Sequence, residues 1–275
     1  MPRPFRLLGA LLTVLALFVV SCGSSGSAGD TSGDPIATTA AGGAPASDLS
    51  GEITVSAAAS LTEAYTRIGE DFEAANPVTK VTFTFDSSGT LSEQILSGAP
   101  SDVFASADES NMAELTDDDL VAGKPIVFAR NQLAIVTKPG NPEGIESLAD
   151  LVDTGVVSLC GEDVPCGAFA AQVLDGVGLE IPESSVTRGQ NVKATLTAVT
   201  EGDAVAAIVY VTDAAAAGDQ VETITIPKDQ NAIAVYPVGV LKGAGNAEVA
   251  RAFADYVVSD EGQAVLKGFG FLPPS

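Results

Sequence analysis

Histidine and tryptophan are both absent from the 275-residue sequence, and basic residues are scarce. Without histidine, the Ser-His-Asp and Cys-His nucleophile arrangements, histidine zinc sites and the most frequent general base are excluded. Without tryptophan, a sugar-stacking platform would depend on 4 Tyr and 11 Phe. Thirteen Lys and Arg against 36 Asp and Glu give a net charge of −23, whereas a nucleic-acid groove needs a basic footprint. The composition points away from enzymes and nucleic-acid partners.

Apolar residues, in contrast, are plentiful. They make up 46% of the chain, which is sufficient for a sizeable core and excludes global disorder. From Glu52 onward, strand-like and helix-like patterns alternate, which is typical of an α/β architecture with a mostly parallel sheet. The patterns predict strands at 53–55, 81–85, 102–106, 133–136, 156–159, 204–210 and 232–241, and helices at 61–75, 91–96, 168–174, 192–200, 248–258 and 261–267.

This α/β part of about 225 residues exceeds a typical single domain, so the sequence predicts two lobes. We place the boundaries near Arg130 and Ala232. Lobe 1 then comprises 50–130 and 233–275, and lobe 2 comprises 131–232. The two strands that cross between the lobes would form a hinge.

The start of the chain has the pattern of a secretory signal peptide. Two arginines precede an apolar run at 7–20 that is too short for a comfortable membrane span. The ending Val19-Val20-Ser21-Cys22 resembles a lipobox, so we expect residues 1–21 to be removed and Cys22 to carry a lipid. The alternative is an ordinary signal peptide with a chance cysteine. Residues 22–49, rich in Gly, Ser, Ala and Thr, are predicted to be a flexible linker.

The two other cysteines, Cys160 and Cys166, are expected to form a disulfide in the oxidising compartment to which such a leader directs a protein. Their spacing is not that of a redox Cys-x-x-Cys motif, and two thiols without histidine make a poor metal site. Free buried thiols are the alternative. A disulfide here would hold the loop 161–165 in one shape.

Four predicted helix beginnings share one chemistry: unpaired backbone N–H groups and the positive end of a helix dipole. They lie at 57–63, 86–91, 164–167 and 190–192. The first has a capping-box pattern, Ser60 followed by Glu63. If these turns meet, they could hold an anion without lysine or arginine. Taken singly, each turn is no more than a helix cap and Tyr210 a core residue, and spacing alone leaves convergence open.

Several of these segments together resemble the periplasmic molybdate-binding proteins of ABC transporters. The resemblance covers almost all of 51–271 and lies in ITVSAAASLT from Ile53, FDSSGTL from Phe85, GAPSDVFASAD from Gly98, VPCG from Val164, Asn191-Val192, AIVYVTDA from Ala207, Tyr236-Pro237-Val238 and the closing 256–271. It implies a two-lobed periplasmic-binding-protein fold (type II-like) with mixed sheets flanked by helices and the ligand between the lobes.

The resemblance also implies which residues hold the ligand, molybdate or tungstate. Ser60 and Ser88 would donate hydroxyl and backbone N–H groups, Cys166 and Val192 backbone N–H groups, and Tyr210 its phenol. Gly89 stands where many relatives have a third serine, and Cys166 where several have alanine. The disulfide is not a feature of every member. The expected partners are the ABC permease and, through lipid alone, the membrane; neither a cofactor nor nucleic acid is expected, and the protein is expected to be a monomer.

A site that offers only donors suits a fully ionised dianion. Hydrogen phosphate carries a proton that would be left unpaired at a cost of about 1–3 kcal/mol. Sulfate is also a dianion and would be distinguished by cavity size, so a binding protein for sulfate or another oxyanion is the nearest alternative. A serine hydrolase using Ser60 or Ser88 lacks both a Gly-x-Ser-x-Gly elbow and a histidine base. A purely structural lipoprotein is a further alternative, and the run at 117–119 is interpreted as a solvated helix start or loop rather than a cation site.

Overall fold

The computed structural model describes residues 49–275, which all belong to one compact unit. The predicted signal peptide 1–21, the lipid site Cys22 and all but the last residue of the predicted linker lie outside the described residues. Within residues 49–275, no helix has the length and apolar character needed to span a membrane.

Nine strands form one sheet in the order β2-β1-β3-β9-β4-β7-β5-β6, with β8 paired to β4. The strands are β1 (Gly51–Ala58), β2 (Thr79–Asp86), β3 (Val103–Ala105), β4 (Ile126–Thr137), β5 (Val157–Cys160), β6 (Val186–Gly189), β7 (Ala206–Tyr210), β8 (Glu222–Thr225) and β9 (Ile233–Val240). Pairing is parallel within β2-β1-β3 and β7-β5-β6, and antiparallel wherever β4 or β9 takes part. The expectation of a mostly parallel sheet was therefore wrong, because β4 and β9 run antiparallel to their neighbours. The predicted mixed α/β class is confirmed.

Eight α-helices accompany the described sheet. They are α1 (Thr62–Ala75), α2 (Ser88–Leu96), α3 (Glu109–Asp117), α4 (Pro165–Gly176), α5 (Val192–Thr200), α6 (Val211–Ala217), α7 (Ala247–Val258) and α8 (Asp260–Gly268), with short 3-10 turns η1 (Ala59–Leu61), η2 (Leu148–Val152), η3 (Glu183–Ser185) and η4 (Gly218–Gln220). The patterns did not predict α3, α6, β6 or β8. The two strands are four residues long and largely exposed or half-buried, so they carry little hydrophobic alternation.

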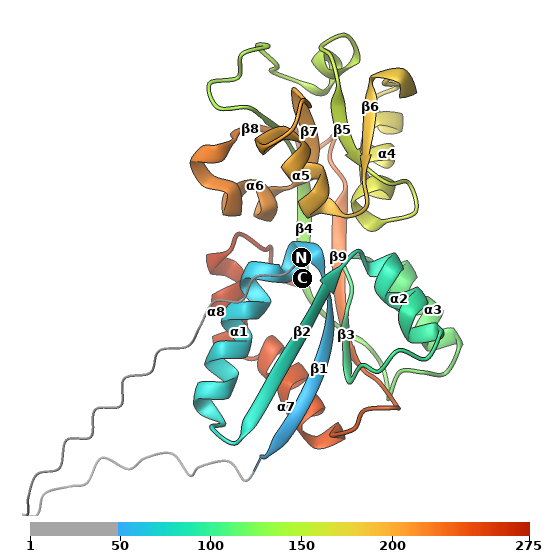
Figure 1. The fold of residues 1–275 in the computed structure, drawn as a ribbon, viewed down its shortest axis with the longest axis vertical. Helices are drawn as coiled ribbons and strands as arrows, with labels where there is room; N and C mark the ends of the chain where they lie inside the picture. The colour runs from blue at the N-terminus through green and yellow to red at the C-terminus, as the bar shows by residue number, and fades with distance from the viewer. Residues whose placement is uncertain (1–48) are drawn as a thin grey trace, which may run out of the picture. The chain divides into compact units, whose positions relative to one another are not determined.

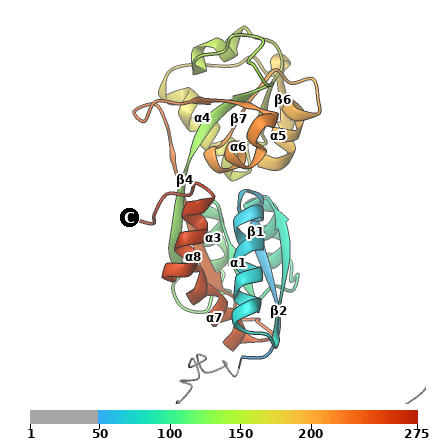
Figure 2. The same ribbon diagram turned by 90° about the vertical axis from the view of Figure 1, so that its left-hand side faces the viewer.

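Two groups of elements are connected by β4 and β9, as both views show (Figures 1 and 2). We call the group with β1–β3, α1–α3, α7 and α8 lobe 1, and the group with β5–β8 and α4–α6 lobe 2. Strand β4 pairs with β9 as far as Gln132 and with β7 from Leu133 onward. This change of partner lies close to the predicted boundary at Arg130. The exact boundaries, 50–130 with 233–275 and 131–232, stay a prediction.

In lobe 1, helices α1, α7 and α8 lie on one side of the strands and α2 with α3 on the other (Figure 1). The first side is filled by aromatic rings, with Tyr65 in contact with Phe83, Phe128 and Phe253. On the other side Phe104 of β3 packs in a smaller cluster with residues of α2 and α3. Since both faces of the sheet are packed, the strand ends hold the turns that follow them in fixed positions.

Candidate ligand-binding pocket

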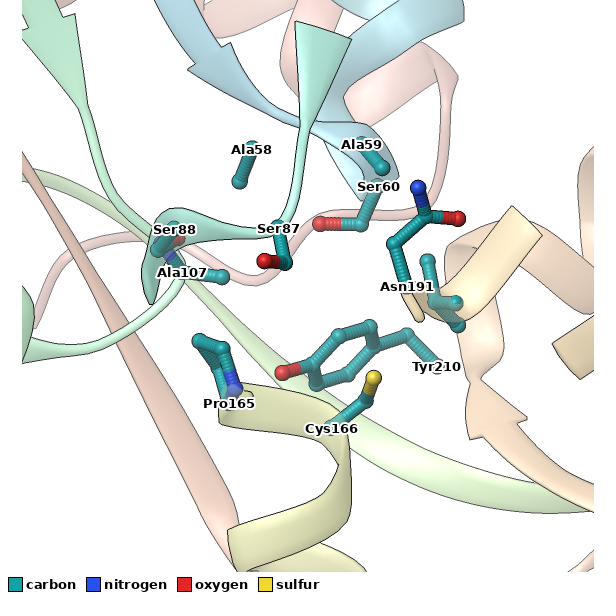
Figure 3. Close-up of a pocket in the computed structure, with 11 residues that line it drawn as sticks. Ala58, Ala59, Ser60, Ser87, Ser88, Ala107, Pro165, Cys166, Asn191 and Tyr210 are labelled. Carbon is teal, nitrogen blue, oxygen red and sulfur yellow. The ribbon is translucent and has the colours of Figure 1, made fainter. Parts of the chain in front are cut away.

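A small pocket lies between the two lobes (Figure 3). Its lining comprises Ala58, Ala59, Ser60, Ser87, Ser88 and Ala107 from lobe 1, and Pro165, Cys166, Asn191, Val192 and Tyr210 from lobe 2. All five residues predicted for the site, Ser60, Ser88, Cys166, Val192 and Tyr210, are brought together here. The four predicted turns therefore converge, which their spacing in the sequence could not establish.

Ser60 lies in the 3-10 turn η1, at the end of β1, and is 4% exposed. The predicted capping box with Glu63 was wrong: α1 begins at Thr62 with Leu61 as its N-cap, and no side chain caps it. The Ser60 hydroxyl instead shares a 2.9 Å hydrogen bond with the Tyr236 hydroxyl. Asn131 Nδ2 donates to the Tyr236 oxygen over 3.4 Å, so the Tyr236 proton is available to Ser60. Either hydroxyl can be the donor in the Ser60–Tyr236 bond, and when Tyr236 donates, the Ser60 proton is left for the pocket.

The second lobe 1 turn is the beginning of α2. Ser87 is its N-cap, with a hydroxyl that accepts from the Thr90 N–H (3.1 Å) and donates to Thr90 Oγ1 (2.8 Å). Ser88 is fully buried, and its hydroxyl accepts a hydrogen bond from the Ala107 N–H over 2.9 Å. Because Ser88 is an acceptor in that bond, its own proton is not used there. Sequence reasoning missed Ala107, which lies far along the chain and becomes a neighbour only through the sheet.

Lobe 2 contributes the first turns of α4 and α5. Pro165 stands at the start of α4, directly before Cys166. Asn191 is the N-cap of α5, and its Oδ1 accepts from the Ala194 N–H over 3.0 Å. N–H groups in the first turn of a helix have no acceptor within that helix, so those of Cys166 and Val192 suit a bound anion.

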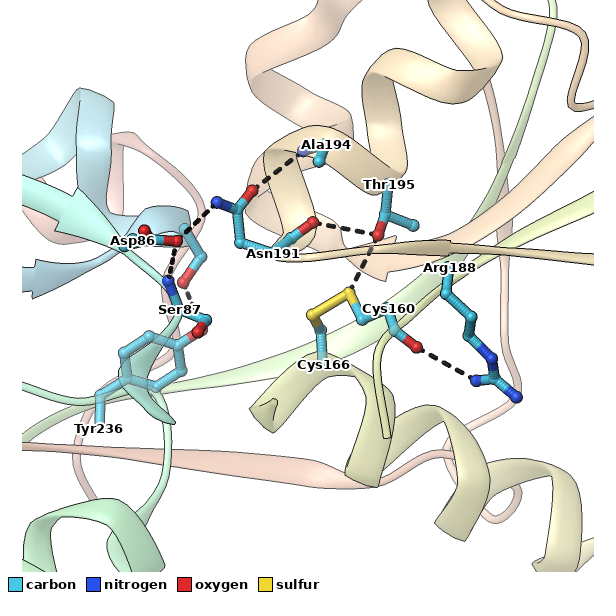
Figure 4. The surroundings of a disulfide bond; sticks show 10 residues. Asp86, Ser87, Cys160, Cys166, Arg188, Asn191, Ala194, Thr195 and Tyr236 are labelled. Atoms are coloured by element: carbon cyan, nitrogen blue, oxygen red, sulfur yellow. Dashed lines mark hydrogen bonds between the residues drawn. A yellow bond between two sulfur atoms is a disulfide. The ribbon is translucent and has the colours of Figure 1, made fainter. Parts of the chain in front are cut away.

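A disulfide connects Cys160, the last residue of β5, to Cys166, with 5.7 Å between their Cα atoms (Figure 4). The structure thus contains the pair that the sequence led us to expect. Thr195 Oγ1 of α5 lies 3.2 Å from Cys160 Sγ and 3.0 Å from the Asn191 carbonyl oxygen. Arg188 Nη1 donates to the Cys160 carbonyl over 3.1 Å. The disulfide therefore fixes the beginning of α4 to β5 and touches the helix that carries the other donor turn.

Tyr210, the last residue of β7, lies between these turns (Figure 3). It is 1% exposed, and its hydroxyl has no hydrogen-bond partner within 3.5 Å among the described residues. The Tyr236 hydroxyl interacts with it more weakly, as one of the smaller influences on its pKa. Burial, reinforced by the neighbouring Tyr236, Asp108 and Asp213, raises the pKa of Tyr210 well above its usual value. The hydroxyl therefore keeps its proton. A buried donor without an acceptor is uncommon in folded proteins, and because this one lines a pocket, a bound ligand could supply the acceptor.

None of the eleven lining residues carries a charge, but an ion-pair network lies close by. Lys193 Nζ is 2.8 Å from Glu63 Oε2 and 3.0 Å from Oδ1 of the fully buried Asp213. Burial alone would lower the pKa of Lys193, but Asp213 and Glu63 outweigh it and the pKa is raised. Burial raises the pKa of Asp213 to about 6 despite the attraction of Lys193.

The other acidic residues of the described part of the chain do not form a cation site. Within residues 49–275, no three Cys, Asp or Glu side chains are grouped so as to hold a metal ion. The run 117–119 is exposed and lies at the end of α3 and in the turn after it, not at a helix start. Asp119 pairs there with Lys242.

Residues 53–272 match the family model of bacterial extracellular solute-binding proteins. The molybdate-binding protein ModA of Mycobacterium tuberculosis (strain H37Rv) is 36% identical over 269 residues, which covers 97% of each chain. Among solved structures, the periplasmic molybdate-binding protein of Azotobacter vinelandii has a TM-score of 0.71 at 21% identity, covering 81% of this chain and all of that one. The sulfate-binding protein SubI of M. tuberculosis has the same TM-score at 20% identity, covering 81% and 86%. These two structures share the fold of this chain, and the fold alone does not separate their ligands.

Proposed function

The chain belongs to the family of bacterial extracellular solute-binding proteins, and from this premise we propose that its pocket binds molybdate for delivery to the permease of an ABC transporter. Identity of 36% across nearly the whole chain to a molybdate-binding protein supports this ligand. The observation that carries the proposal is the buried Tyr210 hydroxyl. It lines the same pocket as four turns rich in N–H donors, and it has no acceptor within hydrogen-bonding distance among the described residues.

In this proposal all five predicted residues donate hydrogen bonds to the anion. Ser60 and Ser88 donate their remaining hydroxyl protons, Cys166 and Val192 donate backbone N–H groups, and Tyr210 donates its phenol proton. Uncharged donors in a buried site can hold a dianion because hydrogen bonds to a charged group are stronger than those between neutral groups. The acidic surface opposes approach of an anion only weakly, since salt screens exposed charges over about 8 Å.

The donor set also supports the choice among oxyanions. Hydrogen phosphate carries a proton that an all-donor pocket would leave without an acceptor, whereas molybdate, tungstate and sulfate carry none near neutral pH. Sulfate would have to be distinguished by the size of the closed pocket. Tungstate fits the same chemistry as molybdate and is part of the proposal.

The cellular setting follows from the family and the leader sequence. The family is extracellular and consists of binding proteins rather than enzymes, so the serine hydrolase alternative is not favoured. We include in the proposal a lipid anchor at Cys22, a monomeric state and the permease as partner; the lipobox-like pattern before Cys22 supports the anchor.

A thermal-shift series with molybdate, tungstate, sulfate and phosphate tests the proposal. Because a ligand that binds only the folded state raises the melting temperature with its concentration, molybdate and tungstate should stabilise the protein at micromolar levels. Sulfate and phosphate should do so weakly or not at all. Stabilisation by sulfate alone would assign the pocket to sulfate, and no shift with any of the four would refute an oxyanion-binding function.

A further inference from the structure

The first turn of α5 contacts lobe 1 on both sides of the Val192 N–H. On one side, Asn191 Nδ2 donates to Asp86 Oδ1 over 2.9 Å (Figure 4). On the other side, Lys193 Nζ donates to both Glu63 carboxylate oxygens over 2.8 Å. Asp86 ends β2 and Glu63 lies in the first turn of α1, so each contact reaches one of the two lobe 1 turns that line the pocket.

We propose that these two contacts form a latch across the pocket, with Lys193 and Asn191 as positioning residues that hold the closed arrangement and thereby the Val192 N–H against the anion. This inference rests on the proposed function. We use the name latch for the pairs Glu63–Lys193 and Asp86–Asn191 only.

The surroundings of Lys193 restrain its side chain in a position that faces lobe 1. Its side chain is 28% exposed and is held within lobe 2 by the fully buried Asp213 at the start of α6. One carboxylate therefore restrains the ammonium group in its own lobe while Glu63 attracts it from the other. A restrained partner loses less side-chain entropy on pairing than two free surface chains would, so this bridge is worth more than an ordinary exposed ion pair.

The variant Glu63→Gln tests the latch, with Asp71→Asn as the matched control. Both changes remove one carboxylate charge from α1, but among the described residues Asp71 forms an ion pair only with Arg67 on the same helix, at 2.8 Å. Lys193 is not mutated, because its removal would leave the buried Asp213 carboxylate without its ion-pair partner and could prevent folding. Removing a negative charge near an anion site would by itself strengthen anion binding, whereas loss of the latch would weaken it. The two effects therefore predict opposite changes in the affinity of Glu63→Gln.

We expect Glu63→Gln to bind molybdate roughly three- to tenfold more weakly than Asp71→Asn, through faster release. Stopped-flow tyrosine fluorescence can follow release, since the chain has no tryptophan and Tyr210 lines the pocket. Raising the salt concentration should reduce the difference in molybdate affinity between wild type and Glu63→Gln, because salt screens the Glu63–Lys193 ion pair. Binding by Glu63→Gln equal to or tighter than that by Asp71→Asn would overturn the latch.

If the wild-type protein did not bind molybdate, the proposed function would be refuted. The latch could still be tested without ligand, by small-angle scattering. Glu63→Gln should have a larger radius of gyration than Asp71→Asn, because its lobes separate more often. Equal radii for the two variants would overturn the latch independently of the ligand.

Discussion

At the scale of single residues, the Tyr210 hydroxyl carries the strongest sign of a ligand. The Tyr65 hydroxyl, in the aromatic core of lobe 1, is also buried and has no hydrogen-bond partner among residues 49–275. Both phenols lose their contact with water, and burial raises the pKa of each. Only Tyr210 lines the pocket, so a comparison of the two residues distinguishes the effect of losing a ligand contact from the effect of losing any buried hydroxyl.

The substitution Tyr210→Phe should therefore weaken molybdate binding by about tenfold or more, since a hydrogen bond to a charged group contributes roughly 1.5–3 kcal/mol. The melting temperature without ligand should not fall, because the lost hydroxyl has no partner in the described chain. Calorimetric titration measures the affinity, and Tyr65→Phe is the control. Equal affinities for the two variants would remove Tyr210 from the site.

At the scale of elements, the pocket depends on where helices begin. Four strand-to-helix or strand-to-turn junctions present their first turns to one point, and the Cys160–Cys166 disulfide holds one of them. Space at this junction is tight as well: a Cβ on Gly167 would lie 1.8 Å from the Gly161 carbonyl oxygen. The beginning of α4 thus has a single arrangement set by both a covalent link and close backbone packing.

Replacing both cysteines, Cys160→Ala with Cys166→Ala, keeps the backbone donor but removes the link. We expect a loss of about 2 kcal/mol in unfolding free energy, the order for closing so short a loop, and a several-fold loss of affinity as the donor turn becomes less ordered. Urea unfolding and calorimetry measure the two effects, and wild type treated with a reductant should behave alike. Abolished binding in a folded double variant would instead indicate that the cysteine side chains contact the ligand.

At the scale of the whole molecule, stability depends on pH because the charge is one-sided. The net charge of −23 makes the folded chain repel itself, and protonation relieves that repulsion. Asp213 adds a specific contribution. Its pKa is about 6 in the folded protein, against an ordinary value of 3.8 for an aspartate, so the folded state takes up a proton more readily between these values. Stability from this group therefore rises as the pH falls through 6.

Between pH 7 and pH 5, Asp213 should add about 1 kcal/mol to the unfolding free energy. The variant Asp213→Asn cannot take up this proton, while the repulsion among the other acidic groups stays nearly the same. Urea unfolding of both proteins at pH 7, 6 and 5 gives the slope of unfolding free energy against pH for each protein. We expect the wild type to gain more stability on acidification than the variant; parallel slopes would contradict a raised pKa for Asp213.

The sequence by itself determined the class of the protein and the chemistry of its site. Alternation of strand and helix patterns gave the α/β class, because burial imposes a period of about two or 3.6 residues on a chain. The absence of histidine and of a Gly-x-Ser-x-Gly elbow around Ser60 and Ser88 argued against a nucleophilic serine, and the turns pointed to backbone and hydroxyl donors. The four helix beginnings came from local motifs, since a helix beginning is specified by the few residues around it. The five site residues and their roles, Tyr210 among them, came from the resemblance to molybdate-binding proteins.

Only the tertiary structure decided how these parts combine. The antiparallel pairing of β4 and β9 depends on long-range register, and no local pattern records it. The Ser60 hydroxyl bonds to Tyr236, 176 positions away, rather than capping α1, and Lys193 meets Glu63 across 130 positions. Contacts of this kind form when packing brings distant elements together, so a single sequence specifies the donors while the fold determines which of them face one another.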